Sequence, residues 1–200
     1  MLKVISGKEI TIKNIQDAIE LDKIFYKKQY CGNLSDCINW INTNHDIYIM
    51  IYDEDVEKII AYTNIMPITK SCYQLIKKGN FIDVKISKEM ILKYLSKNKY
   101  YIYCSSIVVH PDYQKLQVFN LLFNSIISQF ICFKKQHIFI KKLLADAVSL
   151  DGERFCKLFG MEKIKLSNHN SKLYEMSFIP LKFKKNKLNK MLYELYKDII

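Results

Sequence analysis

The hydrophobic and polar positions along the chain repeat with two different periods, and the alternation between them predicts a mixed fold. Runs rich in apolar, aromatic and β-branched residues predict strands. Segments whose apolar residues recur every three or four positions predict amphipathic helices. The expected strands are a first one within Val4–Ile12, then Ile47–Tyr52, Lys58–Ile65, Tyr100–Val109, a strand within His137–Val148, Met161–Leu166 and Leu173–Ile179.

Four helices are expected between these strands. Asn14 is the expected N-cap of a helix over Ile15–Tyr26, and a second helix starts within Asn33–Asp36. The longest helix covers Val118–Phe133, and a short one over Asp151–Phe159 ends at a glycine that suits a left-handed C-terminal cap. The order is strand, two helices, three strands, helix, strand, helix and two strands, which predicts an α/β (α+β) sandwich.

Thr69–Asn98 does not belong to this minimal order, because about thirty residues is long for a connection between neighbouring strands. The segment is therefore an insertion, with helices expected near Ser71–Lys78 and over Ser87–Leu95. It could be a lid that selects a ligand, or an embellishment that packs on the sheet.

The last segment, Lys182–Ile200, follows Pro180 and has the pattern of an amphipathic helix with lysines on its polar side. Such a helix can lie on a membrane, on a partner or on its own domain. We expect the last arrangement, with residues 1–181 forming one domain and residues 182–200 packed on it. The apolar stripe consists of Leu188, Met191, Leu192, Leu195, Tyr196 and Ile199.

The composition is compatible with one folded domain and bears on which classes of partner the protein could bind. The chain has 200 residues, half of them hydrophobic, and a net charge of +11. Arg154 is the only arginine, so almost all of the positive charge is lysine. This pattern favours a solvated lysine surface over binding to nucleic acid or to a membrane.

The six cysteines are scattered and form no C-x-x-C pair, so no metal site is expected. Neither a secretory signal nor a membrane-spanning run is visible. The expectation is a cytoplasmic protein with reduced thiols.

The most informative stretch is Tyr101–Leu122, in which an apolar run stops at His110-Pro111-Asp112-Tyr113 and a helical pattern follows. A strand that ends in a turn and leads into a helix N-terminus forms an anion site. Backbone N–H groups lack internal partners there, and the helix dipole is positive at that end.

The residues Ile107-Val108-Val109-His110-Pro111-Asp112-Tyr113-Gln114 resemble the acyl-CoA signature of GNAT N-acetyltransferases. This resemblance implies a mixed, mostly antiparallel central sheet flanked by helices on both faces. It also implies that the strand backbone at Ile107, Val108 and Val109 pairs with pantetheine. The pyrophosphate would bind the following loop and helix start, at Gln114, Lys115, Leu116, Gln117, Val118 and Phe119.

The loop departs from the family pattern Gln/Arg-x-x-Gly-x-Gly/Ala. Gln114 matches, but Gln117 and Phe119 replace the two small residues. Small residues let phosphate oxygens approach the backbone closely. The donors are backbone N–H groups, so the site survives if both side chains point away from the ligand.

A second segment, Ser149–Met161, resembles the family's Asn-x-x-Ala-x-x-(Leu/Phe)-Tyr-x-x-x-Gly-Phe. Ser149 stands at the Asn position and is a further expected cofactor contact. Cys156 stands at the Tyr that protonates the departing CoA thiolate in many members. It is either that acid or a small packing residue.

The resemblance implies direct attack of an amine on acetyl-CoA, which serves as co-substrate. The reaction needs a donor for the thioester oxygen and a base for the amine proton. Asp146 is the first candidate for the base and Glu153 the second, and water could carry the proton from Ser105, Ser106 or Tyr103. Besides acetyl-CoA, the implied partner is an amine acceptor of unknown identity, and the protein could be a monomer or a homodimer.

The first interpretation is therefore an acyl-CoA-dependent N-acyltransferase of the GNAT family. Two alternatives remain open. One is a GNAT-fold module that binds acyl-CoA or another ligand without catalysis. The other is a basic protein that binds nucleic acid or anionic membrane through Lys182–Lys197.

Overall fold

The computed structural model describes residues 1–114, 116–179 and 187–197. Seven strands are hydrogen-bonded in the order β1-β2-β3-β4-β5-β7-β6. The strands are β1 (Leu2–Ser6), β2 (Tyr48–Asp53), β3 (Lys58–Ile68), β4 (Lys99–Val109), β5 (Phe139–Ala147), β6 (Glu162–Leu166) and β7 (Lys172–Ser177). The α-helices are α1 (Ile12–Phe25), α2 (Leu34–Thr43), α3 (Lys70–Lys77), α4 (Leu116–Lys135), α5 (Leu150–Leu158) and α6 (Lys187–Tyr196).

The sheet is mixed and mostly antiparallel, which confirms the predicted fold class. β4 pairs with β5 in parallel, whereas β1–β2, β2–β3, β5–β7 and β6–β7 are antiparallel pairs. Contacts divide the chain into two compact units. Unit 1 comprises Met1–Met66, Ile82–Lys93 and Ser105–Phe130, and unit 2 comprises Pro67–Phe81, Tyr94–Cys104 and Ile131–Ile200.

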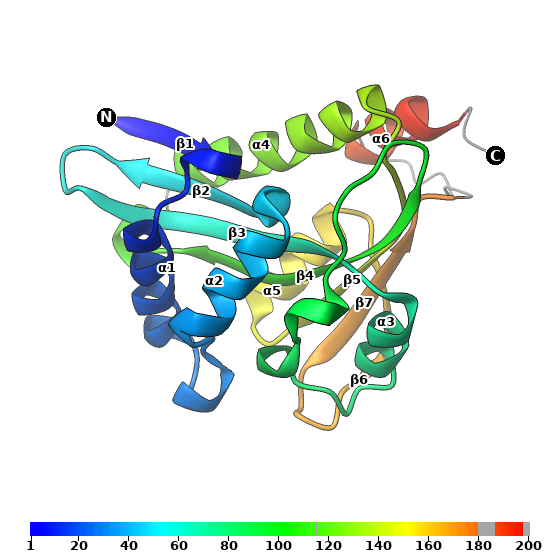
Figure 1. Ribbon diagram of the computed structural model, residues 1–200, viewed down its shortest axis with the longest axis horizontal. Helices are drawn as coiled ribbons and strands as arrows, with labels where there is room; N and C mark the ends of the chain where they lie inside the picture. The colour runs from blue at the N-terminus through cyan, green and yellow to red at the C-terminus, as the bar shows by residue number, and fades with distance from the viewer. Residues whose placement is uncertain (115, 180–186, 198–200) are drawn as a thin grey trace. The chain divides into compact units, whose positions relative to one another are not determined.

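In unit 1, α1 and α2 lie side by side (Figure 1). The cap of α1 differs from the prediction. Thr11 is the N-cap, and Asn14 is the third helical residue, whose side-chain Oδ1 accepts from the Thr11 backbone N–H at 2.9 Å. Two polar residues three positions apart form this reciprocal capping box, and the first one starts the helix. The first strand, expected within Val4–Ile12, ends at Ser6, because a 3₁₀ turn begins at Gly7, whose φ is +60°.

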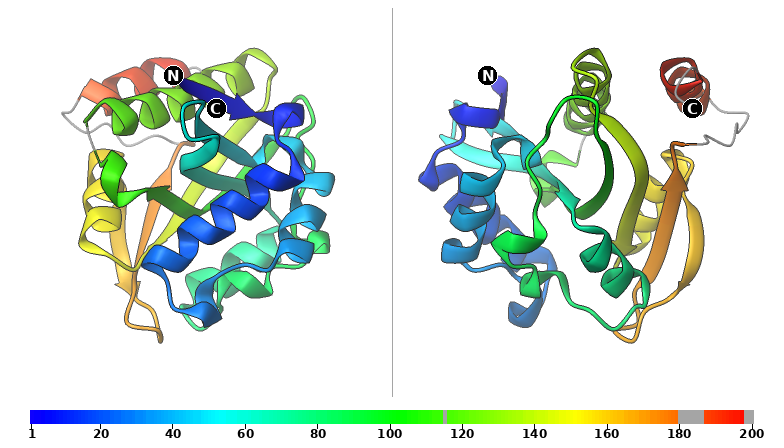
Figure 2. Two further views of the ribbon diagram at one scale, coloured as in Figure 1. Left: turned by 90° about the vertical axis from the view of Figure 1, so that its left-hand side faces the viewer. Right: turned by 45° about the vertical axis from the view of Figure 1, so that its right-hand side comes forward.

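In unit 2, α3 and α5 cover opposite faces of the strands (Figure 2). Successive residues of a strand point to opposite faces. On β7, Tyr174 donates to Glu153 of α5, and the next residue, Glu175, accepts from Tyr73 of α3. The α5 helix ends at Gly160 with φ +81°, which confirms the predicted left-handed cap.

The insertion is partly helical and is anchored at both ends. Its first helix, α3, was predicted, but no second helix covers Ser87–Leu95. That stretch forms a 3₁₀ turn at Lys88–Met90 and then becomes extended. Trp40 donates its indole N–H to the Ile86 carbonyl at 2.8 Å, and Asn44 donates to Leu92 O at 2.8 Å. These bonds hold the backbone of the segment on α2 in an extended form.

The α3 anchor is a buried ion-pair cluster. Glu175 binds Lys77 at 2.6 Å and Lys142 at 2.9 Å, and its side chain is 12% exposed. Burial alone would raise the pKa of Glu175, but hydrogen bonds from Lys77, Tyr73 and Lys142 lower it to about 2. The carboxylate therefore stays charged and joins the insertion to β7.

We expect Glu175→Gln to destabilise the protein by about 1–3 kcal/mol at pH 7, because the lysines lose a charged acceptor inside the protein. Since the folded pKa is depressed, this stabilisation is present above the unfolded pKa and is lost as pH falls toward 2. Urea unfolding at several pH values measures the cost. Glu20→Gln is the matched control, since Glu20 pairs with Lys23 at 2.5 Å but is 68% exposed, and it should change stability by less than about 0.5 kcal/mol.

The C-terminal helix α6 contacts other parts of unit 2. Tyr196 is buried, its hydroxyl accepts from Ile140 N at 3.4 Å, and its ring packs edge-on against Phe178. Residues 182–186 and 198–200 of the predicted helix lie outside the described residues. No helix in the described parts of the chain has the length and apolar character that crossing a bilayer requires.

Candidate functional site

The end of β4 presents one unpaired edge. The ladder between β4 and β5 stops at the pair Cys104–Ala145. The following residues belong to unit 1 and lie beside β3, where Thr63 Oγ1 donates to Ser106 O at 3.0 Å and His110 N donates to Ile60 O at 2.8 Å. No described strand pairs with the other edge of Ile107–Val109.

This edge includes Ile107, Val108 and Val109, the residues predicted to pair with pantetheine. Unpaired backbone N–H and C=O groups on a strand edge can bind an extended ligand as an added strand would. Val108 is buried, while Ile107 and Val109 are half-buried. The side chains therefore fix the strand and leave its backbone edge for a ligand.

The N-terminus of α4 follows this edge in the sequence. A 3₁₀ turn at Pro111–Tyr113 leads to Gln114, whose N–H donates to Pro111 O at 3.3 Å. The α4 helix then runs from Leu116, so its first N–H groups have no acceptor in a preceding helical turn. Lys115 lies outside the described residues.

The two residues that depart from the family pattern do not behave alike. Gln117 is exposed, whereas Phe119 is half-buried and stacks on Phe123, with ring centroids 5.9 Å apart. Residues four apart lie on one side of a helix. The Phe119 ring is therefore held along the side of α4 and not across its end, and Val118 faces the protein interior.

Ser149 is the N-cap of α5, where its hydroxyl oxygen accepts from Gly152 N at 3.1 Å. This bond explains a small hydroxyl residue at the position without any ligand. The Ser149 proton is still available to a ligand, so the predicted cofactor contact stays a prediction.

Gly152→Ala should stabilise the protein by roughly 0.5–1 kcal/mol, because alanine has the higher helix propensity. An added Cβ would meet Ser149 Oγ at 3.4 Å and Ala147 Cβ at 3.5 Å, which are ordinary contacts. Thermal unfolding monitored by circular dichroism measures the change. A lower melting temperature would mean that the space beside Gly152 is tighter than these distances indicate.

Cys156 is buried against β5 with 3% exposure. Burial, together with the nearby Cys104, Asp146 and Glu153, raises the pKa of its thiol to about 12. A thiol with this pKa is a weak proton donor to a departing thiolate of pKa about 8.5.

We therefore expect Cys156→Ala to leave the rate of acyl transfer within about threefold and to cost about 1 kcal/mol of stability through lost packing. Acetyl-CoA turnover at saturation and urea unfolding check the two parts. A fall in turnover of tenfold or more at unchanged acetyl-CoA affinity would identify the thiol as the acid.

Asp146 is the first residue of β5 beyond the ladder with β4, and it pairs with Leu173 of β7. Its Oδ1 atom is buried without a hydrogen-bond partner in the described residues. Burial raises its pKa, against a hydrogen bond from Ser171 and the charge of His169. Sequence reasoning had no signal for Ser171 and His169, which only the β6–β7 hairpin brings to Asp146.

The structure places the three predicted catalytic residues in different surroundings. Cys156 and Asp146 are near one another in unit 2. Ser105 is in unit 1, where its hydroxyl donates to Asn64 Oδ1 at 3.1 Å. Their catalytic roles stay predictions.

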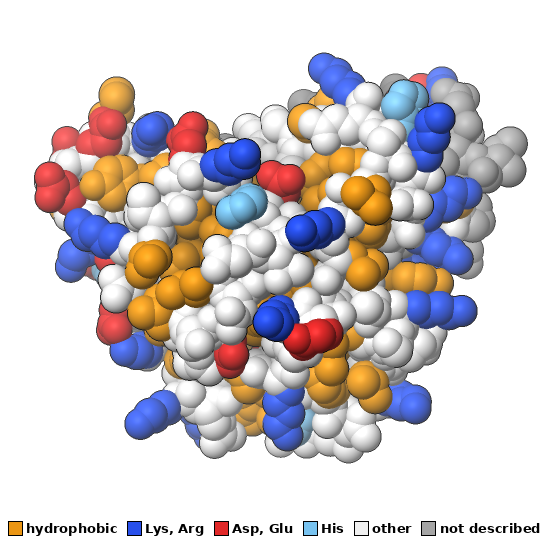
Figure 3. Space-filling model, in the orientation of Figure 1, with side chains coloured by type: hydrophobic (Ala, Val, Ile, Leu, Met, Phe, Trp, Pro, Cys, Tyr) orange, Lys and Arg blue, Asp and Glu red, His pale blue; other side chains and the backbone are white. Residues whose placement is uncertain are grey.

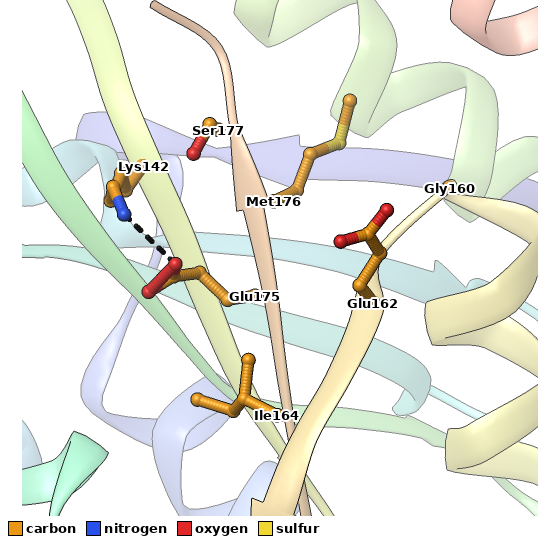
Figure 4. Close-up of a pocket in the computed structure, with 7 residues that line it drawn as sticks. All are labelled: Lys142, Gly160, Glu162, Ile164, Glu175, Met176 and Ser177. Atoms are coloured by element: carbon orange, nitrogen blue, oxygen red, sulfur yellow. Dashed lines mark hydrogen bonds and ion pairs between the residues drawn. The ribbon is translucent and has the colours of Figure 1, made fainter. Parts of the chain in front are cut away.

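Unit 2 also contains a cavity of about 230 Å³ (Figure 4). Lys142 and Glu175 of the α3 anchor point toward each other in its lining, which also contains the charged residue Glu162. The Glu175 carboxylate already accepts hydrogen bonds from Lys77, Lys142 and Tyr73. The lining consists of Lys142, Gly160, Glu162, Ile164, Glu175, Met176 and Ser177.

The basic residues do not form one continuous patch on the face drawn in Figure 3, where lysine side chains are dispersed among acidic and uncharged ones. Within the described residues, no three His, Cys, Asp or Glu side chains group as metal ligands would.

No protein-family model and no curated protein matches the sequence. The fold, in contrast, matches solved structures. The loading GNATL domain of CurA from Lyngbya majuscula aligns with a TM-score of 0.64 at 13% identity, over 88% of this chain and 98% of that one.

Two further structures are similar. Arabidopsis thaliana Naa50, in complex with the bisubstrate analogue CoA-Ac-MVNAL, gives a TM-score of 0.52 at 12% identity, over 88% of this chain and 98% of that one. Mosquito arylalkylamine N-acetyltransferase like 5b gives a TM-score of 0.57 at 11% identity, over 88% of this chain and 100% of that one. With the strand order and the β4–α4 arrangement above, these matches show that the chain has the fold of the GNAT N-acetyltransferases in a divergent form.

Proposed function

We propose that the protein is an acyl-CoA-dependent N-acyltransferase that transfers an acetyl group from acetyl-CoA to a primary amine. The observation that carries the proposal is the unpaired edge of Ile107–Val109, which leads through a short turn to the N-terminus of α4. One element offers backbone groups to the amides of pantetheine, and the other offers N–H groups to the pyrophosphate.

In this mechanism the backbone edge at Ile107–Val109 holds the thioester, and an N–H of the edge donates to the carbonyl oxygen as negative charge develops. The amine nitrogen attacks the carbonyl carbon, the C–S bond breaks, and CoA leaves as a thiolate. Thiolate is a reasonable leaving group without a strong acid. The demanding requirement is therefore a group that accepts the amine proton.

The second candidate is a module that binds acyl-CoA without turnover. Gln117 and Phe119 in place of small residues, and Cys156 in place of the tyrosine, favour it. Both candidates require the ligand, so they differ only in chemistry.

Calorimetry with acetyl-CoA and CoA tests what the two candidates share, and thiol release across a panel of primary amines separates them. We expect micromolar to submillimolar binding and release of CoA with at least one amine. No binding at millimolar acetyl-CoA would exclude both candidates. Binding without CoA release on any amine would favour the module.

A further inference from the structure

The proposed reaction lacks a proton acceptor on β4, and unit 1 contains a buried carboxylate that no part of that proposal uses. Asp22, near the C-terminal end of α1, is 8% exposed. Tyr62 of β3 is 3% exposed and donates its hydroxyl to Asp22 Oδ1 at 2.5 Å.

The hydroxyl of Ser106, on β4, extends this series of hydrogen bonds. The side chain of Ser106 hydrogen-bonds to the Tyr62 hydroxyl. The Tyr62 proton is used toward Asp22, so Ser106 is the donor in this bond. The chain therefore runs from Ser106 Oγ–H to Tyr62 Oη–H to Asp22 Oδ1, and every donor points toward the carboxylate.

The Ser106 end of this hydrogen-bond chain lies on β4, next to the strand segment that we propose binds acyl-CoA. Ser106 is half-buried and directly precedes Ile107–Val109, the part of β4 with an unpaired edge. Thr63 Oγ1 donates to the Ser106 carbonyl at 3.0 Å and fixes this residue. Ser106 thus joins the unpaired segment to the interior of unit 1.

Ser105, the residue before Ser106, belongs to a different series of side-chain interactions. Ser105 Oγ donates to Asn64 Oδ1, Asn64 lies opposite Tyr48 in the β2–β3 ladder, and Tyr48 hydrogen-bonds to Cys37. Burial raises the pKa of Cys37 to about 11 and that of Tyr48 above its ordinary value. This second chain contains no carboxylate that could take up a proton.

We propose that Ser106, Tyr62 and Asp22 form a proton relay, in which Asp22 takes up the proton released when an amine attacks the acyl-CoA thioester. The relay rests on the proposed function. As the N–C bond forms and the C–S bond breaks, the amine proton moves to Ser106 Oγ. The Ser106 proton moves to Tyr62 Oη, and the Tyr62 proton moves to Asp22. CoA leaves as a thiolate, and the Asp22 proton later returns to solvent.

The surroundings of Asp22 suit this role. Desolvation raises its pKa to about 7, against the hydrogen bond from Tyr62, and the charge of Asp83 raises it further. A proton acceptor is most effective when its pKa lies near the working pH. The other titratable groups that interact with it are Cys31, Cys37 and Tyr48, from the α1–α2 connection, α2 and β2. Lys23, the next residue of α1, interacts with Cys31.

The test measures the pH dependence of kcat/KM with acetyl-CoA and a weakly basic amine that is already neutral at pH 5. The wild-type rate should rise with pH to a plateau, with a midpoint near 7. Asp22→Asn should remove this dependence and lower the plateau about 100-fold. Tyr62→Phe should lower the plateau similarly and raise the midpoint, since Asp22 loses a donor to its charged form.

Tyr48→Phe is the matched control, because it removes a buried hydroxyl from the neighbouring strand and from the chain that has no carboxylate. It should keep the wild-type profile. An unchanged profile in Asp22→Asn would overturn the relay, as would loss of the profile in Asp146→Asn with Asp22→Asn unaffected. Carbon-13 NMR of the aspartate carboxyls measures the titration of Asp22 independently of the kinetics. A titration midpoint near 4 for Asp22 would also overturn the relay.

Calorimetry on the same proteins separates the relay from the function it depends on. All variants should bind acetyl-CoA within about threefold of wild type, since none of the four substituted residues belongs to the backbone edge or the α4 terminus. Absence of binding in wild type would overturn the proposed function itself. Binding without transfer to any amine would overturn the relay, because no proton would then be released.

Discussion

Leu116→Pro should weaken acetyl-CoA binding by about 10- to 100-fold while leaving α4 folded. Leu116 is the first residue of α4, where the N–H group has no helical acceptor. Proline is tolerated at this position of a helix, because the missing N–H makes no intrahelical bond and φ is already suitable. The variant thus removes one backbone donor and little else.

The size of the effect follows from the charge of the ligand. A hydrogen bond to a charged group contributes about 1.5–3 kcal/mol, and each 1.4 kcal/mol is tenfold in the dissociation constant. Calorimetry with acetyl-CoA measures the loss, and far-UV circular dichroism shows whether the helix is retained. Leu116→Ala keeps the N–H group and should bind within about threefold of wild type.

Phe119→Gly completes this series. Because the Phe119 ring stacks on Phe123 along the side of α4, its removal should cost stability and should not weaken binding. Equal weakening by Leu116→Ala and Leu116→Pro would mean that the Leu116 side chain, and not its backbone N–H, determines affinity. Unchanged affinity in both would place the pyrophosphate elsewhere.

The parts of the site that are continuous in sequence could be predicted from it. The change of period at His110-Pro111 marks the end of β4 and the start of α4, because proline and a polar turn stop a strand. Both halves of the acyl-CoA segment are therefore visible without a structure. The helix around Gly152 and its glycine cap at Gly160 follow from local rules in the same way.

Features that depend on distant residues could not be predicted. Ser87–Leu95 has the residues of a helix, yet Trp40 holds the Ile86 carbonyl from a position 46 residues away and keeps the segment extended. Asp22 and Tyr62 are 40 residues apart, and neither lies in a motif. Only the packing of α1 on β3 joins them, and a single aspartate in a helix carries no local sign of burial.

The second large effect concerns stability, because a buried carboxylate kept for proton transfer should destabilise the fold. The folded-state pKa of Asp22 is raised from 3.8 to about 7. In an unfolded chain the carboxyl ionises near 4, whereas in the folded protein it resists ionisation up to about 7. Stability is therefore lost as pH rises through this window. Integrated from pH 5 to pH 8, the loss is roughly 2–4 kcal/mol.

Asp22→Asn should remove this dependence, because the amide resembles the protonated acid and still accepts the Tyr62 hydroxyl. We expect the variant to gain stability over wild type by roughly 2–4 kcal/mol more at pH 8 than at pH 5, as measured by urea unfolding at both values. Asp112→Asn, at a carboxylate that is 84% exposed, should show no such difference. A pH-independent difference between Asp22→Asn and wild type would mean that Asp22 is ionised throughout. Greater stability with lower turnover would be the balance expected of a residue kept for function.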